Sequence, residues 1–377
     1  MPRKPRVCVW EADYDSIKEV IPRIFQEFPL DIAGKSILVK PNMLGPYPPE
    51  RHVCTHPAVI TALVEYLQQA GAGEVLVGDN PGIEGYGTVE KTAEACGIRQ
   101  AAGNAFVNLG TGVERVALPG SGIMVNISKK VLDCDVVISV PKFKTHTFTM
   151  LTGAIKNSYG FLVGGDKARL HVENQAYREF SRRLVEIYRL RVPDLCIMDA
   201  VVGLQGNGPS CKTTFPAGRV IASDNGVAMD SVMAHMMGWK PADVEMIKHA
   251  ASLGLGPDDL DGIDLKGEAA RLKRFNRPMS GLPQVFGGRW MGTMFAGVTR
   301  PRFNVDSGSC NACASCLKAC PAEAIAISNR LPDYDYEKCI SCYCCMELCP
   351  RQAISLKNTL RIRLMRATCG MKASSSR

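Results

Sequence analysis

The sequence predicts an α/β domain with a largely parallel sheet flanked by helices, followed by a small C-terminal domain rich in cysteine. Over residues 1–265, short apolar runs alternate with stretches of helical periodicity. Such alternation is typical of parallel sheets, because parallel neighbours need a crossover connection. The second observation is a dense set of cysteines between residues 310 and 349, in a chain whose 377 residues suffice for two domains.

Five short apolar runs are predicted as buried strands of this sheet. Runs of this length without alternation are expected where both faces of a strand are covered. In chain order they are Ile37–Val39, Val75–Val77, Val136–Val140, Leu195–Met198 and Val220–Ala222.

Three stretches are predicted as helices, because their apolar residues recur at three- and four-residue spacing. The first, Ser16–Phe28, contains Pro22, which we expect in or near the first turn. The second begins at His56-Pro57 and stops at Gly71. The third, Asn174–Leu190, turns its arginines outward. The inward residues are Ile17, Val20, Ile21, Ile24 and Phe25 in the first, Val59, Ile60, Leu63, Val64 and Leu67 in the second, and Tyr177, Phe180, Leu184 and Ile187 in the third.

Each predicted strand is followed by polar or conformationally special residues. If the strands are parallel, these ends share one edge of the sheet, where ligands of open α/β sheets bind. Asn42, Asp79 and Asn80 are therefore predicted to bind a cofactor. The alternative is that such residues end strands because they form turns. The strand ends are Lys40-Pro41-Asn42, Asp79-Asn80-Pro81-Gly82, Pro141-Lys142, Asp199 and Asp224-Asn225.

The stretch 141–173 follows the third predicted strand and is the densest in chemically useful groups. Clustered cations among glycines could hold a carboxylate or phosphate. Histidines there could donate protons or bind a metal, although a single histidine of this kind more often pairs with backbone groups. The residues predicted to form the catalytic site are Lys142, Lys144, His146, Lys156, Asn157 and His171.

Cys54 and His56 flank Thr55 at the start of the second predicted helix. A helix N-terminus lowers the pKa of a thiol, so Cys54 could be a thiolate or a soft metal ligand. The alternative is that Thr55 caps the helix and that the cysteine is incidental.

Eight cysteines form two copies of the pattern C-x2-C-x2-C-x3-C-P, separated by 29 residues at every position. Three thiolates from one tight loop and a fourth at the start of a helix suit an iron–sulfur cluster. Zinc sites usually separate their cysteine pairs by longer loops and include histidine, and disulfides do not suit a chain without an export signal. Cys344, an extra thiol in the second loop, is either free or an alternative ligand.

This pattern resembles the two-cluster bacterial ferredoxins, which implies a small α+β ferredoxin-like domain with two 4Fe–4S clusters. In that family the fourth cysteine of each run ligates the other cluster. Carried over, one cluster would use Cys310, Cys313, Cys316 and Cys349, and the other Cys339, Cys342, Cys345 and Cys320. The sequence leaves open whether the α/β domain binds a further cofactor.

The large domain resembles the family called domain of unknown function 362 over about residues 5–260. The matching strings are LVKPNM at Leu38–Met43, CTHPAVITALVEYLQQAGAGEVLVGDNPG at Cys54–Gly82, VPKFKTHTFTMLTGAIKNSYG at Val140–Gly160 and GNGPS at Gly206–Ser210. The resemblance implies a fold and a domain arrangement, often with a C-terminal two-cluster ferredoxin, but no agreed activity. It also suggests a distant fold kinship with the nickel-dependent lactate racemase group.

We expect four segments: an α/β domain at 1–265, a connector at 266–303, a ferredoxin-type domain at 304–356 and a basic tail at 357–377. The connector is rich in Arg, Gly and Pro, and we expect its apolar residues to pack onto one of the domains. These residues are Trp290, Met291, Met294 and Phe295.

The formal net charge of +8 lies mostly in the tail, because the last 27 residues hold seven Lys or Arg and no acid. This tail is either solvated or touches an acidic partner or membrane surface. No basic groove with interleaved aromatics occurs elsewhere, which argues against nucleic-acid binding. The sequence has no apolar stretch of membrane-spanning length and no signal-peptide core, and its thiols suit a reducing cytoplasm.

Three functions fit these features. The first is a cytoplasmic iron–sulfur oxidoreductase that takes electrons from a soluble donor protein and acts on a small anionic substrate. The second is an electron-transfer or adaptor subunit of a redox complex, without catalysis. The third is a metallocofactor-assembly protein, in which Cys54, His56 and His146 act as ligands.

Overall fold

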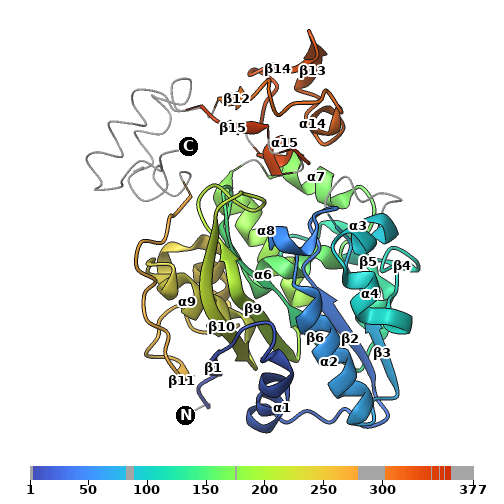
Figure 1. Ribbon diagram of the computed structural model, residues 1–377, viewed down its shortest axis with the longest axis vertical. Coiled ribbons are helices and arrows are strands. Elements are labelled where there is room, and N and C mark those ends of the chain that lie inside the picture. The colour runs from blue at the N-terminus through green and yellow to red at the C-terminus, as the bar shows by residue number, and fades with distance from the viewer. Residues whose placement is uncertain are drawn as a thin grey trace.

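The computed structural model describes residues 3–81, 89–174, 176–278, 302–340, 342–347, 349–351 and 353–357. Within them a mixed sheet of nine strands forms the centre of the larger domain (Figure 1). Its order is β11-β1-β10-β9-β6-β2-β3, with β7 and β8 beside β9. The strands are β1 (Arg6–Glu11), β2 (Ser36–Pro41), β3 (Glu74–Val77), β6 (Val136–Val140), β7 (Lys142–His146), β8 (Met150–Thr152), β9 (Leu195–Leu204), β10 (Thr214–Ser223) and β11 (Asp264–Lys266).

Most neighbouring strands are parallel, which confirms the predicted fold class. β3, β2, β6 and β9 form one parallel series, and β7 runs parallel to β9. β10, however, is antiparallel to both β1 and β9. Asp224 and Asn225 therefore lie at the opposite edge from the ends of β2, β3 and β6, so the prediction that they share that edge is wrong. There Asp224 accepts a hydrogen bond from the Arg6 N–H at 2.9 Å, and Asn225 caps a helix.

All five predicted strands form, whereas β1, β7, β8 and β11 were not predicted. β7 shows why, because its sequence KFKTH looks solvent-facing and yet all five residues are buried. A buried polar strand breaks the usual hydrophobic pattern, and it is stable only where its polar groups find partners. Asp199 likewise lies within β9 and not at its end, because that strand continues to Leu204.

The three predicted helices form as α1 (Ile17–Glu27), α2 (Pro57–Gln69) and α8 (Tyr177–Leu190), with the predicted apolar residues inward and Tyr177 partly so. Pro22 lies in the second turn of α1, later than expected. The other helices are α3 (Val89–Ala95), α4 (Ile98–Ala102), α5 (Lys129–Asp133), α6 (Ala154–Asn157), α7 (Asp166–Glu173), α9 (Gly226–Met236), α10 (Glu245–Ser252), α14 (Ser315–Lys318) and α15 (Cys344–Glu347), with 3₁₀ turns η1 (Pro49–Arg51), η3 (Gly103–Ala105), η4 (Ser158–Phe161) and η5 (Pro241–Asp243). No helix among the described residues combines the length and the apolar character of a membrane span.

Two hydrophobic cores cover the two faces of the sheet. Along β9, Cys196 and Met198 belong to one core and Leu195 and Ile197 to the other, because successive strand residues point to opposite faces. Helices α1 and α2 pack on the second face, and α6, α8, α9 and α10 on the first. The sheet is thus buried on both sides, and only its edges and strand ends can present a ligand site.

In the described part of the C-terminal domain, two short helices and two strand pairs lie beyond one end of the sheet (Figure 1). β12 (Phe303–Val305) pairs with β15 (Ile354–Leu356), and β13 (Ile325–Ser328) pairs with β14 (Leu331–Tyr334). A separate hairpin of the large domain joins β4 (Val113–Ala117) to β5 (Met124–Ser128). The tail at 358–377 and most of the connector, including Trp290, Met291, Met294 and Phe295, lie outside the described residues.

Candidate functional site

A buried ion pair lies at the carboxyl ends of β2 and β3. Lys40 is the second-last residue of β2, and its Nζ is 2.7 Å from Oδ1 of Asp79, which follows β3. The two side chains are 1% and 2% exposed. The other Asp79 oxygen accepts the backbone N–H of Met43 at 2.7 Å. The parallel register of the two strands brings these residues together, as the rule for strand ends predicts.

Asn157 approaches the same ion pair from the other side of the sheet edge. Its Oδ1 accepts hydrogen bonds from Lys40 Nζ at 2.9 Å and from Asn42 Nδ2 at 3.2 Å, and its Nδ2 donates to Ser139 Oγ at 3.0 Å. With all its contacts made inside the protein, Asn157 positions Lys40 and Asn42.

Helix α6, which carries Asn157, is held by a buried carboxylate beneath it. Asp230 accepts the backbone N–H groups of Ala154 and Ile155 at 2.6 and 3.0 Å. Burial raises the pKa of Asp230 to about 7, although these two N–H groups oppose the change. A capping carboxylate suits the positive end of a helix, so Asp230 fixes where the helix begins.

Lys167, Tyr159 and His171 extend the cluster on the side of α7. Lys167 Nζ donates to the carbonyls of Asn80 and Pro81 at 2.5 and 3.2 Å, and burial lowers its pKa to about 7. The Tyr159 hydroxyl lies 3.0 Å from His171 Nδ1. Burial lowers the pKa of His171 to about 4, so the imidazole is neutral at physiological pH.

A second polar cluster lies under β7 and β9, where Lys142 and Asp199 are register partners. Their Nζ and Oδ2 atoms are 2.6 Å apart, and both side chains are fully buried. The Tyr14 hydroxyl donates to Asp199 at 3.2 Å and accepts from Lys142 at 3.0 Å. The Tyr14 ring stacks on His56 at 3.6 Å between centroids, and burial lowers the pKa of that histidine to about 4.

Lys144 and His146 follow Lys142 along β7 and are buried as well. Lys144 Nζ donates to the carbonyl of Val53 at 2.8 Å. His146 Nδ1 accepts the backbone N–H groups of Phe148 and Thr149 at 3.1 and 3.2 Å. Burial, helped by neighbouring lysines, lowers the pKa of His146. Because Nδ1 is an acceptor, the neutral ring carries its proton on Nε2.

The structure thus brings most of the predicted residues to one edge of the sheet. Lys156 belongs to the group of polar side chains around Lys40, Asp79 and Tyr159, with its Nζ 5.9 Å from the centroid of the Tyr159 ring. Lys142 lies apart in the second cluster, against Asp199 and Tyr14. The prediction omitted Lys40, Lys167, Asp199, Tyr14 and Tyr159 from the site. The first three stand among the polar residues that sequence reasoning noticed. Tyr159 lies within the stretch 141–173 but was not singled out, and nothing in the sequence around Tyr14 marked it.

Several charged side chains at this edge of the sheet are buried. Four lysines are at least 90% buried, namely Lys40, Lys142, Lys144 and Lys167. Two buried aspartates contact them, Asp79 and Asp199.

At the start of α2 the pKa of the Cys54 thiol is lowered, as the prediction allowed, although the cause is its neighbours Cys96 and Lys144 and not the helix N-terminus. His56, and not Thr55, caps the helix, with its Nδ1 accepting the Ala58 N–H at 3.2 Å. Among the described residues, no three His, Cys, Asp or Glu side chains come together to hold a single metal ion. Cys54, His56 and His146 therefore do not form a preassembled metal site.

The two cysteine runs of the C-terminal domain adopt the same local geometry, 29 residues apart. Cys310 and Cys339 each donate their backbone N–H to an aspartate carbonyl at 3.0 Å. Cys320 and Cys349 each accept a backbone N–H on sulfur, at 3.2 and 3.3 Å. Hydrogen bonds of this kind tune the potential of a cluster. Ala314 and Tyr343 occupy equivalent positions with φ of 59° and 64°.

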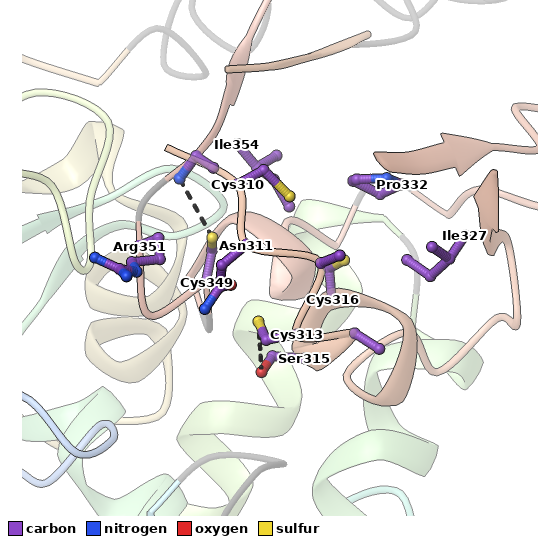
Figure 2. Close-up of a pocket in the computed structure, with 13 residues that line it drawn as sticks. Cys310, Asn311, Cys313, Ser315, Cys316, Ile327, Pro332, Cys349, Arg351 and Ile354 are labelled. Atoms are coloured by element: carbon purple, nitrogen blue, oxygen red, sulfur yellow. Dashed lines mark hydrogen bonds between the residues drawn. The ribbon is translucent and has the colours of Figure 1, made fainter. Parts of the chain in front are cut away.

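The residues around the first cysteine run fit one 4Fe–4S cluster. Cys310, Cys313, Cys316 and Cys349 line the same pocket, and Figure 2 shows Cys349 facing the loop of the other three. A four-iron cluster binds one thiolate at each iron, so its ligands surround a space and do not converge on a point. Cys344 is buried in α15, outside this pocket.

Comparison with known proteins finds a matching family for each of the two domains. A family model described as a domain of unknown function, DUF362, matches residues 37–235, and one described as a 4Fe-4S dicluster domain matches residues 302–350. Fold and cysteine loops together define an iron–sulfur protein with a ferredoxin-type domain. The chain belongs to the DUF362 family, whose model covers more than half of it.

A curated relative, the thylakoid-associated protein sll1697 of Synechocystis sp., is 32% identical over 229 residues, which are 59% of this chain and 70% of the relative. Two solved structures show weaker similarity at 13% identity. The lactate racemase apoprotein of Thermoanaerobacterium thermosaccharolyticum has a TM-score of 0.37, over 51% of this chain and 50% of that one. A Thermotoga maritima protein has a TM-score of 0.36, over 57% and 56%. This chain thus spans about half of each, and neither likeness bears on activity.

We predict that Gly160→Ala disrupts the group of polar side chains around Lys40 and Asp79. A Cβ at this position would overlap the Asp79 carboxylate and stand 2.7 Å from Lys40 Nζ. Overpacking of this kind costs about 1–3 kcal/mol, which chemical denaturation should show as a lower free energy of unfolding. Gly165→Ala is the matched control, because its Cβ would meet nothing within 4 Å. Equal stability of the two variants would contradict the close approach.

We also predict that Lys167→Met flattens the pH dependence of stability above neutrality. The folded-state pKa of about 7 lies below the ordinary value of 10.5, so the folded protein binds fewer protons between these values. Stability of the wild type therefore rises through this window, by at most about 1.4 kcal/mol per pH unit from this group. Denaturant unfolding from pH 7 to 10 would measure it, with the exposed Lys18→Met as control. An unchanged slope in Lys167→Met would refute the shift.

Proposed function

We propose that this protein is an oxidoreductase in which two 4Fe–4S clusters supply electrons, one at a time, to a small anionic substrate at the carboxyl edge of the sheet. Cys310, Cys313, Cys316 and Cys349 would hold one cluster. Cys339, Cys342, Cys345 and Cys320 would hold the other. The crossed assignment is supported by the pocket that Cys349 shares with the first run.

The observation that carries the proposal is the turn between β7 and β8, residues 147–149, which touches both parts of the protein. Its backbone N–H groups hold His146 at the candidate site. Its Phe148 side chain packs against Tyr343, at 6.3 Å between ring centroids, and Tyr343 stands between Cys342 and Cys345 in the second cysteine loop. One turn thereby brings the second cysteine run to the candidate site.

A series of packed aromatic rings continues from this contact into the site. Between ring centroids, Phe148 lies 5.2 Å from Phe180. The Phe180 ring in turn lies 4.4 Å from His171 and 5.7 Å from Tyr159. All four side chains belong to the interior or its margin, so the path is closely packed. Close packing of this kind favours electron transfer between a cluster and a bound molecule.

The exposure of the cysteines supports a direction for this transfer. Cys313 in the first run is exposed, whereas its counterpart Cys342 in the second run is 9% exposed and lies next to the large domain's contact. The first cluster would therefore meet a soluble electron-donor protein, and the second would face the candidate site.

The large domain would bind the substrate and supply the proton. Lys144, Lys156 and Lys167 would hold its anionic group. His146 and His171 have lowered pKa values and act as neutral hydrogen-bond donors, whereas Lys167, whose pKa is about 7, is matched to release a proton near neutrality. Asn157 would position Lys40 and Asn42 without touching the substrate.

We predict about eight iron atoms and about eight sulfides per chain in anaerobically purified protein. Cys345→Ser should lose roughly half of this iron, because Cys345 is an assigned ligand, whereas the neighbouring Cys344→Ser should retain it. Iron analysis and electron paramagnetic resonance of the reduced protein would distinguish the two. Loss of a cluster in Cys344→Ser alone would overturn the ligand assignment.

We predict that a carboxylate or phosphate ester with a reducible double bond reoxidises the reduced clusters, followed by their visible absorbance in single turnover. Lys156→Met should abolish the reaction, and Phe148→Ala should slow it at least tenfold, both with full iron content. Phe215→Ala, which removes a ring packed elsewhere on Phe275, is the control. Unchanged rates in both variants would exclude this site. No reoxidation by a broad panel, together with co-purification of a stable protein partner, would favour the adaptor function.

A further inference from the structure

The side chain of Asn42 is the last member of a series of hydrogen bonds that begins at the buried ion pair. Lys40 Nζ contacts Asp79 at 2.7 Å and donates to Asn157 Oδ1 at 2.9 Å. Asn42 Nδ2 donates to the same Asn157 oxygen at 3.2 Å. The backbone of Asn42 is held as well, because its N–H donates to Thr55 Oγ1 at 2.8 Å and its carbonyl accepts the Thr55 N–H at 3.0 Å. Both the backbone and the side chain of Asn42 therefore have fixed positions.

These hydrogen bonds also determine which end of the Asn42 amide carries the oxygen. An ammonium group only donates, so the Asn157 atom that faces Lys40 Nζ must be the amide oxygen. The other end of the Asn157 amide lies 3.3 Å from the Lys40 carbonyl, which only accepts, and 3.0 Å from Ser139 Oγ. Because the Asn157 oxygen itself only accepts, the Asn42 atom beside it must be the nitrogen. Asn42 Oδ1 therefore lies at the end of the amide that does not contact Asn157.

Asn42 Oδ1 is buried, and among the residues that the structure describes it has no hydrogen-bond partner. A buried acceptor without a donor is costly, and such a group in a native protein calls for a partner from outside the chain. The Lys40 ammonium group, bound to the same Asn157 oxygen as the Asn42 amide, disfavours a metal cation as that partner. A neutral O–H or N–H group meets no such repulsion and supplies the missing donor.

Asn42 is connected through its partners to two of the lysines proposed to bind the substrate. The segment 53–55 holds the Asn42 backbone and, through a carbonyl oxygen, also Lys144, whose Nζ lies 2.8 Å from that oxygen. Asn157, which holds the Asn42 side chain, belongs to α6 together with Lys156. The same short segments thus fix the unpaired acceptor and the groups that would hold an anion.

We propose that Asn42 determines substrate specificity, because its side-chain oxygen accepts a hydrogen bond from an O–H or N–H group that the substrate carries in addition to its anionic group. This inference rests on the proposed function and narrows it to anions that are also hydrogen-bond donors. An analogue in which a methyl group replaces the donor proton leaves Asn42 Oδ1 buried and unpaired, and such analogues are rejected by sites of this kind. The preference is a property of binding, so it is measurable without any electron transfer.

The test measures the affinity of the full-length, cluster-loaded and oxidised protein for three matched pairs of anions by isothermal titration calorimetry. The pairs are hydroxyacetate and methoxyacetate, N-acetylglycine and N-acetylsarcosine, and hydroxymethylphosphonate and methoxymethylphosphonate. We expect the donor-bearing member of at least one pair to bind about tenfold more tightly than its methylated partner. Asn42→Ala should bring this ratio close to one. Asn225→Ala is the matched control, because it removes a half-buried amide that caps α9 at the opposite edge of the sheet, and it should leave the ratio unchanged.

Equal affinity within every pair would overturn the inference and leave the anion site standing. A preference for the donor-bearing member that persists in Asn42→Ala would also overturn it, because the preference would then come from another residue. Absence of binding by all six anions would overturn both the inference and the anion site. Failure of the bound anions to reoxidise the clusters bears only on the proposed electron transfer. The wild-type comparison can refute the inference by itself, so the test holds even if Asn42→Ala fails to fold.

Discussion

The buried ion pair between Lys40 and Asp79 is the constraint on which the rest of the site depends. Burying two charges costs several kcal/mol per ion unless each is paired and hydrogen-bonded. Here the Met43 N–H and the Asn157 amide complete that pairing, which ties the end of β2 to the loop after β3 and to α6. The ion pair also requires glycine at position 160, because a side chain there would collide with Asp79 and Lys40. The stretch 153–171 is thus held to the sheet edge by electrostatics as much as by apolar packing.

Burial has two effects on the charged groups at this edge of the sheet. It strengthens the attraction between the lysines and an anion, because the local dielectric is low. It also lowers the pKa of Lys167 to about 7 and that of His171 to about 4, so one group releases a proton readily and the other stays neutral. In the proposed function, a single environment would supply both the binding charge and a proton donor matched to neutral pH.

The sequence predicts the parts of this protein that follow simple periodicities. The five apolar runs and the two cysteine loops were found because burial on both faces and cluster ligation each impose a regular pattern. β7 was missed because its polar residues are buried by partners far away in the chain, such as Asp199 for Lys142. The placement of Asp224 failed for a related reason, since strand direction depends on pairing and not on composition. Tyr14 enters the second cluster only through that tertiary pairing.

The two cysteine loops of the C-terminal domain have equivalent backbones but different surroundings. Ala314 and Tyr343 hold equivalent left-handed positions, each at a cost of roughly 1–2 kcal/mol, so the two loops share a backbone that their cysteines require. The side chains at these positions differ. The alanine carries no surface beyond its methyl group, whereas the tyrosine ring reaches Phe148 on the large domain. The contact between Tyr343 and Phe148 thus joins the second cysteine loop to the large domain, and Ala314 gives the first loop no ring for an equivalent contact.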